Sequence, residues 1–190
     1  MPSATSIMHE YRKEKGYDKY FFGKGIDIGC GSDVAKDFMD VFNNVESVTP
    51  YDVEQGDANY CADVLDETFD FVYSSHCLEH MIDPYVAFGN WLRVCKTGGY
   101  MVHCVPHEIF YEKCIWPSKY NKDHKTSWTL EWSSNMSKTV HVPDFLDYFS
   151  EKMEAISVET ILRNFDFSRL QEDQTRESAI CQIEFIGKKK

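Results

Sequence analysis

The sequence predicts an α/β fold built on a doubly wound, mostly parallel sheet. Short apolar segments of strand length alternate with helical patterns as far as Val105, which is typical of a sheet whose strands are joined by helices. A glycine turn follows the first apolar segment, and two further strand-like segments lie near the end of the chain. Together these observations predict a Rossmann-like sheet with an antiparallel C-terminal hairpin strand.

The first half of the chain supplies strands and one helix after a lead-in over residues 1–23, which is expected to be helical or irregular. Apolar residues at helical spacing predict a helix over Val34–Phe42, which Ser32 or Asp33 can cap. Pro50 weakens the far end of the second expected strand. The expected strands are Gly25–Ile28, Val45–Val53, a weaker one at Tyr60–Val64, and Phe69–Ser75.

The second half begins with a helix over Pro84–Val94, where Pro84 suits the first helical turn. Two glycines, Gly98 and Gly99, end that helix before a buried strand. The alternation then breaks after Pro106. The remaining expected elements are a strand at Tyr100–Val105, a helix at Pro143–Phe149, and a hairpin of strands at Met153–Phe165 and Ala179–Ile186.

A chain of 190 residues suits a single domain, so residues 1–190 are expected to fold as one unit. Residues 107–141 lack regular periodicity and are long for a connection. Long loops of this kind are usually functional, so this segment is expected to be a substrate lid inserted in the domain. It contains Trp116, Trp128 and Trp132, whose rings would form either a substrate wall or a small core of their own.

Composition excludes several classes of protein. The net charge of −11 argues against a protein that binds nucleic-acid phosphates, which requires a basic footprint. The sequence contains no run of about 18 apolar residues, so no membrane span is expected. The first residues show no signal-peptide pattern. The seven cysteines form no CxxC pair, and several lie in apolar runs. They are expected to be free thiols, which places the protein in a reducing cytoplasm.

The turn after the first strand reads Asp27-Ile28-Gly29-Cys30-Gly31 and leads into a helix. Such a turn binds nucleotides because glycines allow close ligand approach and the helix N-terminus attracts an anionic group. Val34 stands where a dinucleotide fingerprint has its third glycine, which disfavours NAD. Asp52 at the end of the second strand can accept hydrogen bonds from a ribose. A ribose and a carboxylate without a pyrophosphate are features of S-adenosylmethionine (SAM).

Two more segments accompany this turn. Phe69–His80 is a strand that ends in Leu-Glu-His, and Arg93–Tyr100 reads Arg-Val-Cys-Lys-Thr-Gly-Gly-Tyr. With Asp27–Gly31, they resemble the first motif, the fourth-strand segment and the turn before the fifth strand of class I SAM-dependent methyltransferases. They occur in the order and at the spacing of that family. The resemblance covers roughly residues 20–108 and is specific when the three segments are taken together; the C-terminal part resembles the family only in outline.

The resemblance implies a role for each residue of the glycine turn. Gly29 and Gly31 would lie against the methionine part of SAM. Asp27 would orient the turn and the amino group of the cofactor. Asp52 would hold the ribose hydroxyls. The expected cofactor is therefore SAM, with S-adenosylhomocysteine as its product.

The resemblance also implies contacts from two later segments. Asp63 would contact the adenine amino group, and the backbone amide of Val64 would contact a ring nitrogen. Asp63 is otherwise an acid of a surface loop. The backbone near Ser75 and His76 would close over the sulfonium side of the cofactor.

His76 and His80 are four residues apart, with Cys77 between them, and histidines at this spacing on a helix can bind zinc. The HExxH order is absent, since Glu79 adjoins His80, and the same segment carries the methyltransferase resemblance. The sequence therefore predicts no metal, and His80 is expected to have a structural role.

Methyl transfer to a hydroxyl needs a base, because the donor is already activated but the acceptor must lose a proton. His107 follows the fifth family strand, at the edge where such sheets bind ligands. Asp123 and His124 lie in the middle of the expected lid, and His141 at its end. The catalytic candidates are His107, His124 and Asp123, and either histidine is otherwise an ordinary exposed side chain.

The function predicted is transfer of a methyl group from SAM to an oxygen or nitrogen of a small molecule, with a sugar or nucleotide-sugar hydroxyl favoured. The alternatives are a nucleic-acid or protein methyltransferase, a SAM-binding protein without catalysis, and an NAD oxidoreductase. A nucleic-acid base methyltransferase usually has a Pro-Pro-aromatic turn, where this chain has Ser74–Cys77. The expected partner is a small-molecule acceptor, without nucleic acid or membrane.

Overall fold

A computed structural model describes residues 4–31, 34–131 and 136–190. The expected cap residues Ser32 and Asp33 and the lid residue Trp132 lie outside these residues. Among the described residues, no helix is long and apolar enough to cross a membrane. All seven cysteines are free thiols, as expected, and five of them are buried.

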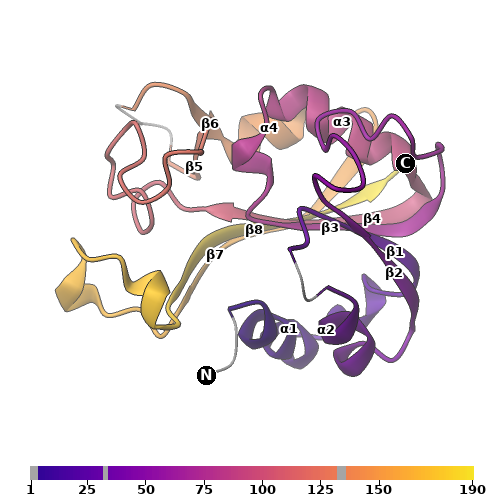
Figure 1. Cartoon of the computed structure of the whole chain (residues 1–190), viewed down its shortest axis with the longest axis horizontal. Helices are drawn as coiled ribbons and strands as arrows, with labels where there is room; N and C mark the ends of the chain where they lie inside the picture. Colours follow the sequence, from indigo (N-terminus) through magenta and orange to yellow (C-terminus); the bar gives the residue numbers. More distant parts are fainter. Residues whose placement is uncertain (1–3, 32–33, 132–135) are drawn as a thin grey trace.

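A central sheet is covered by helices on both faces (Figure 1). Helices α1 (Ala4–Glu14) and α2 (Val34–Val41) cover one face, and α3 (Pro84–Val94) and α4 (Val142–Tyr148) cover the other. Helix α3 begins as predicted, with Pro84 in its first turn and the Asp83 side chain accepting hydrogen bonds from two backbone amides. The expected lead-in therefore contains a regular helix.

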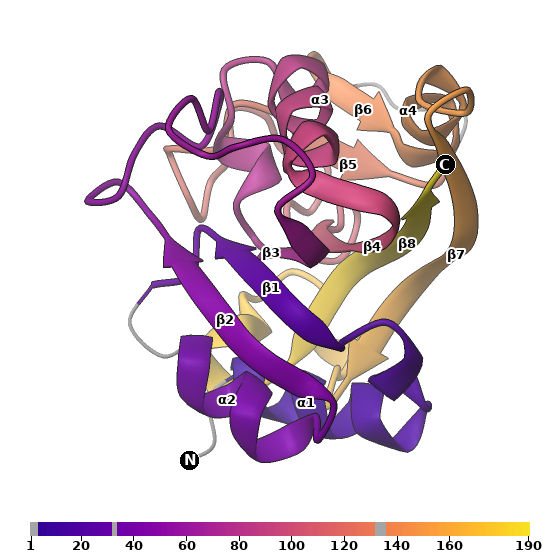
Figure 2. The ribbon, with the colours of Figure 1, turned by 90° about the vertical axis from the view of Figure 1, so that its right-hand side faces the viewer.

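The sheet has six strands in the order β2-β1-β3-β4-β8-β7 (Figure 2). Strands β2, β1, β3 and β4 run parallel, whereas β8 pairs antiparallel with both β4 and β7. The predicted fold class and its antiparallel C-terminal hairpin are therefore confirmed. The strands are β1 (Gly23–Ile28), β2 (Val45–Tyr51), β3 (Phe69–Ser75), β4 (Cys95–Pro106), β7 (Met153–Arg163) and β8 (Ile180–Lys189).

Pro50 does not interrupt β2, because β2 is at the edge of the sheet, where a missing backbone N–H breaks no ladder. Strands β1 and β3 are neighbours in the sheet although β2 lies between them in the chain. This reversal of strand order is the point at which open α/β sheets bind ligands. The loops after β1, β2, β3 and β4 therefore meet at one edge.

The predicted strand at Tyr60–Val64 is wrong, because this segment forms turns. Its backbone groups have partners other than a strand. The Cys61 amide donates to the Asp57 carbonyl (2.8 Å), and the Arg93 guanidinium donates to the carbonyls of Tyr60, Cys61 and Val64. Because these backbone groups already have hydrogen-bond partners, the segment does not need to pair with a neighbouring strand.

The 107–141 segment is more regular than predicted. It contains a short parallel pair, β5 (Ser127–Thr129) and β6 (Thr139–His141). Trp128 is fully buried, and its ring lies against Phe145 and Phe185 in the main core. Trp128 is therefore a core residue rather than part of a substrate wall.

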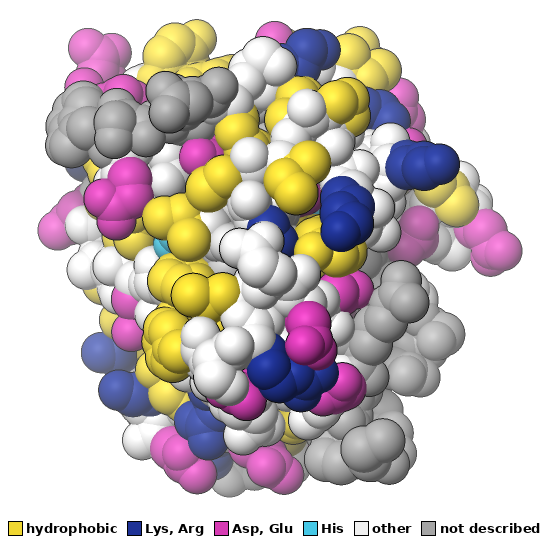
Figure 3. Space-filling model, turned by 90° about the vertical axis from the view of Figure 1, so that its left-hand side faces the viewer, with side chains coloured by type: hydrophobic (Ala, Val, Ile, Leu, Met, Phe, Trp, Pro, Cys, Tyr) yellow, Lys and Arg dark blue, Asp and Glu magenta, His cyan; other side chains and the backbone are white. Residues whose placement is uncertain are grey.

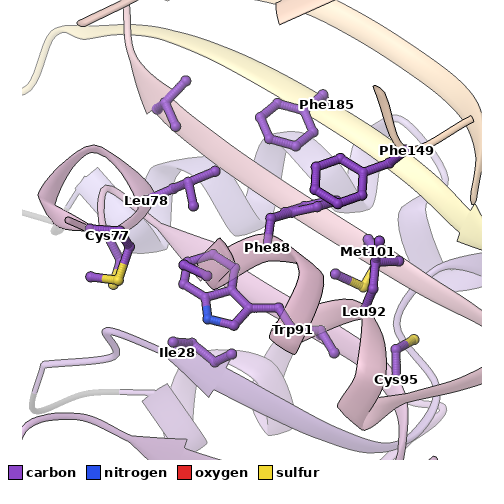
Figure 4. Close-up of a cluster of buried hydrophobic side chains, with 14 of the residues drawn as sticks. Ile28, Cys77, Leu78, Phe88, Trp91, Leu92, Cys95, Met101, Phe149 and Phe185 are labelled. Atoms are coloured by element: carbon purple, nitrogen blue, oxygen red, sulfur yellow. The ribbon is translucent and has the colours of Figure 1, made fainter. Parts of the chain in front are cut away.

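The main core lies between the sheet and the helices α3 and α4. Figure 4 shows the Trp91 ring of α3 among apolar side chains that include Ile28 and Phe88. The indole nitrogen of Trp91 donates a hydrogen bond of 2.7 Å to the Ala58 carbonyl. The core thereby fixes the loop after β2, which forms part of the site described below.

Helix α1 is attached to the sheet by a buried ion pair between Arg12 and Glu184 of β8, whose side chains are 0% and 1% exposed. Arg12 also donates to the Tyr73 hydroxyl (3.0 Å) and lies beside the buried His9. Burial, together with the charge of Arg12, lowers the pKa of His9 to about 2, so this ring is neutral.

Replacing Arg12 with methionine is expected to destabilise the fold by about 3–5 kcal/mol, because Glu184 is left buried without its counter-charge. The measurement is urea unfolding followed by circular dichroism. Arg169→Met is the control, since Arg169 pairs with Glu172 and Glu177 at the surface and its loss is expected to cost much less. Equal losses in the two variants would contradict the anchoring role of Arg12.

Candidate functional site

The turn after β1 has the geometry of a close ligand approach. Gly29 and Gly31 have φ angles of 76° and 63°, a region that glycine adopts without strain. The Gly29 amide donates to the Tyr51 carbonyl (2.8 Å), and the Gly31 amide donates to the Asp52 carboxylate (3.0 Å). A Cβ atom on Gly29 would lie 2.5 Å from the Cys77 side chain. The turn is therefore closed against both β2 and the segment after β3.

A cavity of about 690 Å³ opens beside this turn, and we call it the first cavity. Three predicted cofactor residues line it: Gly29, Asp52 and His76. Most of the other residues that line the first cavity were not predicted from the sequence. They belong to the turns after β2 and to the segment after β3. The other lining residues are Val53, Gly56, Asp57, Ala58, Asn59, Cys77, His80, Met81 and Asp123.

The remaining predicted cofactor residues are not among the residues that line the first cavity. Asp27 is buried at the end of β1, and Ser75 is partly buried at the end of β3. Asp63 accepts a hydrogen bond from the Tyr51 hydroxyl (2.6 Å), and the Val64 amide donates to the Cys61 carbonyl. The adenine contacts of Asp63 and Val64 remain predictions, whereas Ala58 and Asn59 line the first cavity.

A second cavity of about 260 Å³ lies on the other side of the segment after β3. Both cavities are lined by His76 and His80, so these two side chains form a common wall. The 107–141 segment contributes Tyr111, Asn121 and His124 to the second cavity, and its role as a lid stays a prediction. The other lining residues are Glu79, Pro106, Thr175, Ala179, Ile180, Cys181 and Gln182.

Glu79 lies at the centre of a group of histidines in this wall. Its side chain is 0% exposed, and neither carboxylate oxygen has a hydrogen-bond partner. The Oε1 atom lies 3.7 Å from Nδ1 of His76, 3.9 Å from Nε2 of His80 and 3.8 Å from Nε2 of His124. The structure thus brings His124 of the lid to the Leu-Glu-His segment.

Two further carboxylates hold the outer nitrogens of these rings. Nδ1 of His80 lies 2.9 Å from Asp123, and Nδ1 of His124 lies 2.5 Å from the buried Glu112. Asp123 therefore pairs with His80 and not with its neighbour His124. Hydrogen bonds from Lys125 and then from His80 lower the pKa of Asp123 below its ordinary value.

The backbone between β3 and the histidine group is unusual at His76, whose φ is 55°. A residue with a side chain occupies this region at a cost, and such strain concentrates at functional sites. Desolvation favours the neutral ring, but attraction to Glu79 raises the pKa of His76 above its ordinary value. Its Nε2 donates to the Gln182 side chain (3.0 Å).

The other two histidine candidates lie away from the cavity walls. His107 is buried, and its Nδ1 accepts a hydrogen bond from the Ile109 amide (3.1 Å). Desolvation lowers the pKa of His107 to about 4, so its ring is neutral near pH 7. His141 lies 3.1 Å from Asp144 and 3.2 Å from the Leu130 carbonyl. Neither residue is among those that line the two cavities.

Comparison with known protein families identifies the family of this chain. The model of a methyltransferase domain matches residues 9–170. The chain belongs to this methyltransferase family. The match spans the glycine turn, the residues of the first cavity and the 107–141 segment, so the predicted class I SAM-dependent methyltransferase is confirmed. Among curated proteins, the search found no match.

Solved structures share the fold of this methyltransferase at low sequence identity. A protein of Listeria monocytogenes assigned to the SAM-dependent methyltransferases has a TM-score of 0.64 at 13% identity, with 97% of this chain and 98% of that one covered. A SAM-dependent methyltransferase of Archaeoglobus fulgidus has a TM-score of 0.56 at 16% identity, with 95% and 94% covered. The N-methyltransferase NodS of Bradyrhizobium japonicum, in complex with S-adenosylhomocysteine, has a TM-score of 0.57 at 9% identity, with 96% and 85% covered.

The first cavity of the methyltransferase fits a ligand of the size of SAM. Its volume lies in the range of small-molecule sites, about 300–1,000 Å³. The Gly29 backbone forms one side of it, without a side chain to obstruct approach. Asp52 supplies a carboxylate at the end of β2, where a ribose is bound in related sheets.

Gly29→Ala is expected to weaken binding of S-adenosylhomocysteine at least about tenfold, because the methyl group meets Cys77 and the turn must open. Isothermal titration calorimetry measures the affinity. The matched control is Gly98→Ala, which imposes alanine on a similar φ of 80° but has no atom within 4 Å of the new Cβ and lies outside the cavity. Similar affinities in the two variants would contradict this role of the Gly29 turn.

Proposed function

We propose that this methyltransferase transfers the methyl group of SAM to an oxygen or nitrogen of a small molecule bound in the second cavity. The observation that carries the proposal is the common wall of His76 and His80 between the two cavities. SAM supplies an activated methyl group, so the main task of the chain is to align the acceptor with it. Two adjoining cavities meet that requirement.

The size and lining of the second cavity favour a small polar acceptor. Its volume of about 260 Å³ is below the usual range for drug-sized ligands. The aromatic ring of Tyr111 and the polar side chains of Asn121, Thr175 and Gln182 line it, and such a combination suits a hydroxylated ring such as a sugar. A sugar hydroxyl is therefore the favoured acceptor, and of a nucleotide sugar only the sugar ring would occupy this cavity.

The surface offers little support for a nucleic-acid substrate. The net charge is −11, and the face in Figure 3 shows acidic and basic side chains interspersed. Binding to phosphates depends on clustered lysine and arginine. A protein or nucleic-acid acceptor and a SAM-binding role without catalysis are kept as outcomes of the experiment below.

Of the three catalytic candidates, His124 is the one placed to contact the acceptor, since it lines the second cavity. Asp123 lines the first cavity, where it orients His80. It is a positioning residue in this proposal. His107 is the weakest of the three, because its ring is buried beside Phe110 and its Nδ1 is already engaged by a backbone amide.

The proposal is tested with SAM that carries a tritiated methyl group. The protein is incubated separately with pools of nucleotide sugars, small hydroxylated compounds, small amines, unfolded protein, RNA and DNA. Label is expected in a small-molecule pool. Label confined to protein or nucleic acid would contradict the proposed acceptor class, and SAM binding without any transfer would favour a SAM-binding protein without catalysis.

Variants of the two lid-region histidines separate their roles once an acceptor pool is found. His124→Gln is expected to lower turnover about 100-fold with the affinity for S-adenosylhomocysteine retained, which is the scale on which one positioned group contributes. His107→Gln is expected to change turnover far less. The reverse pattern would move the catalytic role to His107.

A further inference from the structure

The histidines around Glu79 and their carboxylate partners contain more hydrogen-bond acceptors than N–H donors. A carboxylate only accepts hydrogen bonds, so the ring nitrogens that contact Asp123 and Glu112 must be the N–H donors of His80 and His124. The opposite nitrogen of each neutral ring then presents a lone pair. Both Nε2 atoms face Glu79 Oε1, which is itself an acceptor without a hydrogen-bond partner.

His76 repeats this arrangement. Its Nε2 donates to the Gln182 side-chain oxygen, which leaves Nδ1 as the acceptor in a neutral ring. Nδ1 lies 3.7 Å from Glu79 Oε1. The compact group consists of Glu79, His80 and His124, with His76 beside Glu79, and a cation placed between the two Nε2 atoms and Glu79 Oε1 satisfies all three of these acceptors.

The charge balance of the described residues supports the same conclusion. Glu79 and Glu112 are both buried, and no lysine or arginine of the described part of the chain lies within ion-pair distance of either carboxylate. Burying carboxylates without a counter-charge is costly. A divalent cation would balance both charges.

The spacing of the atoms suits a metal ion. A ligand atom of Glu79, one of His80 and one of His124 all lie within 4.8 Å of one another. Two donors that each lie about 2.1 Å from one ion are at most about 4.2 Å apart. The separations of 3.8 Å and 3.9 Å from Glu79 Oε1 to the two Nε2 atoms fall within this limit, and the two rings need to approach each other by at most about 0.6 Å to meet it as well.

The outer contacts are those of a metal centre. Histidines that bind metals almost always donate their other ring nitrogen to a carboxylate, a carbonyl or water, which fixes the ring and its tautomer. Asp123 does this for His80, and Glu112 does it for His124. The lid is fixed to the centre as well, since the amides of Lys125 and Thr126 donate to the Glu79 carbonyl.

We propose that Glu79, His80 and His124 form a binding site for one divalent cation at the wall between the two cavities. Two imidazoles and one carboxylate favour Mn²⁺, Fe²⁺, Co²⁺ or Zn²⁺ over Mg²⁺, which prefers oxygen ligands and keeps its waters. All three side chains line the second cavity, so an open position of the ion faces the acceptor.

The consequence for catalysis rests on the proposed function. A cation at this wall would bind an acceptor oxygen, orient it toward the first cavity and favour release of its proton to water. His124 then acts as a ligand rather than as a base. The site favours an oxygen acceptor, because a hydroxyl loses its proton less readily than an ammonium group and gains more from a bound cation.

The test measures metal binding without SAM or acceptor. Its outcome is therefore independent of the outcome of the methyl-transfer screen. The protein is treated with a chelator, dialysed and titrated with Mn²⁺, followed by electron paramagnetic resonance, and with Zn²⁺, followed by calorimetry. One ion per chain is expected. Absence of binding by both ions would overturn the proposal and leave a network of protonated histidines and carboxylates.

Variants locate the ion. Glu79→Gln and His124→Gln are each expected to weaken Mn²⁺ binding more than tenfold. Asp123 is 70% exposed, so Asp123→Asn tests the site without risk to the core and is expected to weaken binding about tenfold through His80. The matched control is Asp144→Asn, since Asp144 is 60% exposed and contacts His141 in the same way outside the cavities. Unchanged binding in Asp123→Asn and in the folded ligand variants would contradict the assignment.

Discussion

The parallel pairing of β1 with β2 and β3, and of β3 with β4, is the constraint on which the site depends. It brings the carboxyl ends of these strands to one edge, although they are widely separated in the chain. The glycine turn follows β1, Asp52 follows β2 and the His76–His80 segment follows β3. Each loop contributes to the first cavity because its strand ends there.

The segment after β3 has a second consequence, because it carries the charge that holds the lid. Glu79 faces His124 with its side chain and accepts from the Lys125 and Thr126 amides with its carbonyl. The lid is thereby fixed over the second cavity through the same residue that would bind the cation. If both proposals hold, acceptor binding, the position of the 107–141 segment and metal binding are coupled at Glu79.

The motifs allowed much of the fold to be predicted, together with three residues of the first cavity. Glycines with positive φ and an acid at a strand end have local causes, so Gly29 and Asp52 could be identified from neighbouring residues. The Tyr60–Val64 segment resembled a strand because its apolar pattern does not reveal that Arg93 satisfies its carbonyls. Local patterns contain no information about such distant partners.

The same reason explains why the histidine group was missed. The contact of His80 with Asp123 joins residues 43 positions apart, and adjacency of Asp123 and His124 suggested the wrong pair. The absence of an HExxH order predicts that no metal is bound, and the cation titration tests that prediction. The signal available in the sequence was an acid beside a histidine in both segments, which becomes informative only when the fold brings the two segments together.

The central claim is that the two cavities form one reaction site across the wall of His76 and His80. A crystal structure of the protein with S-adenosylhomocysteine tests this claim most directly. We expect the ligand in the first cavity, against Gly29 and Asp52, with its sulfur on the side of His76 and His80. A ligand bound elsewhere, or a sulfur directed away from the second cavity, would contradict the account.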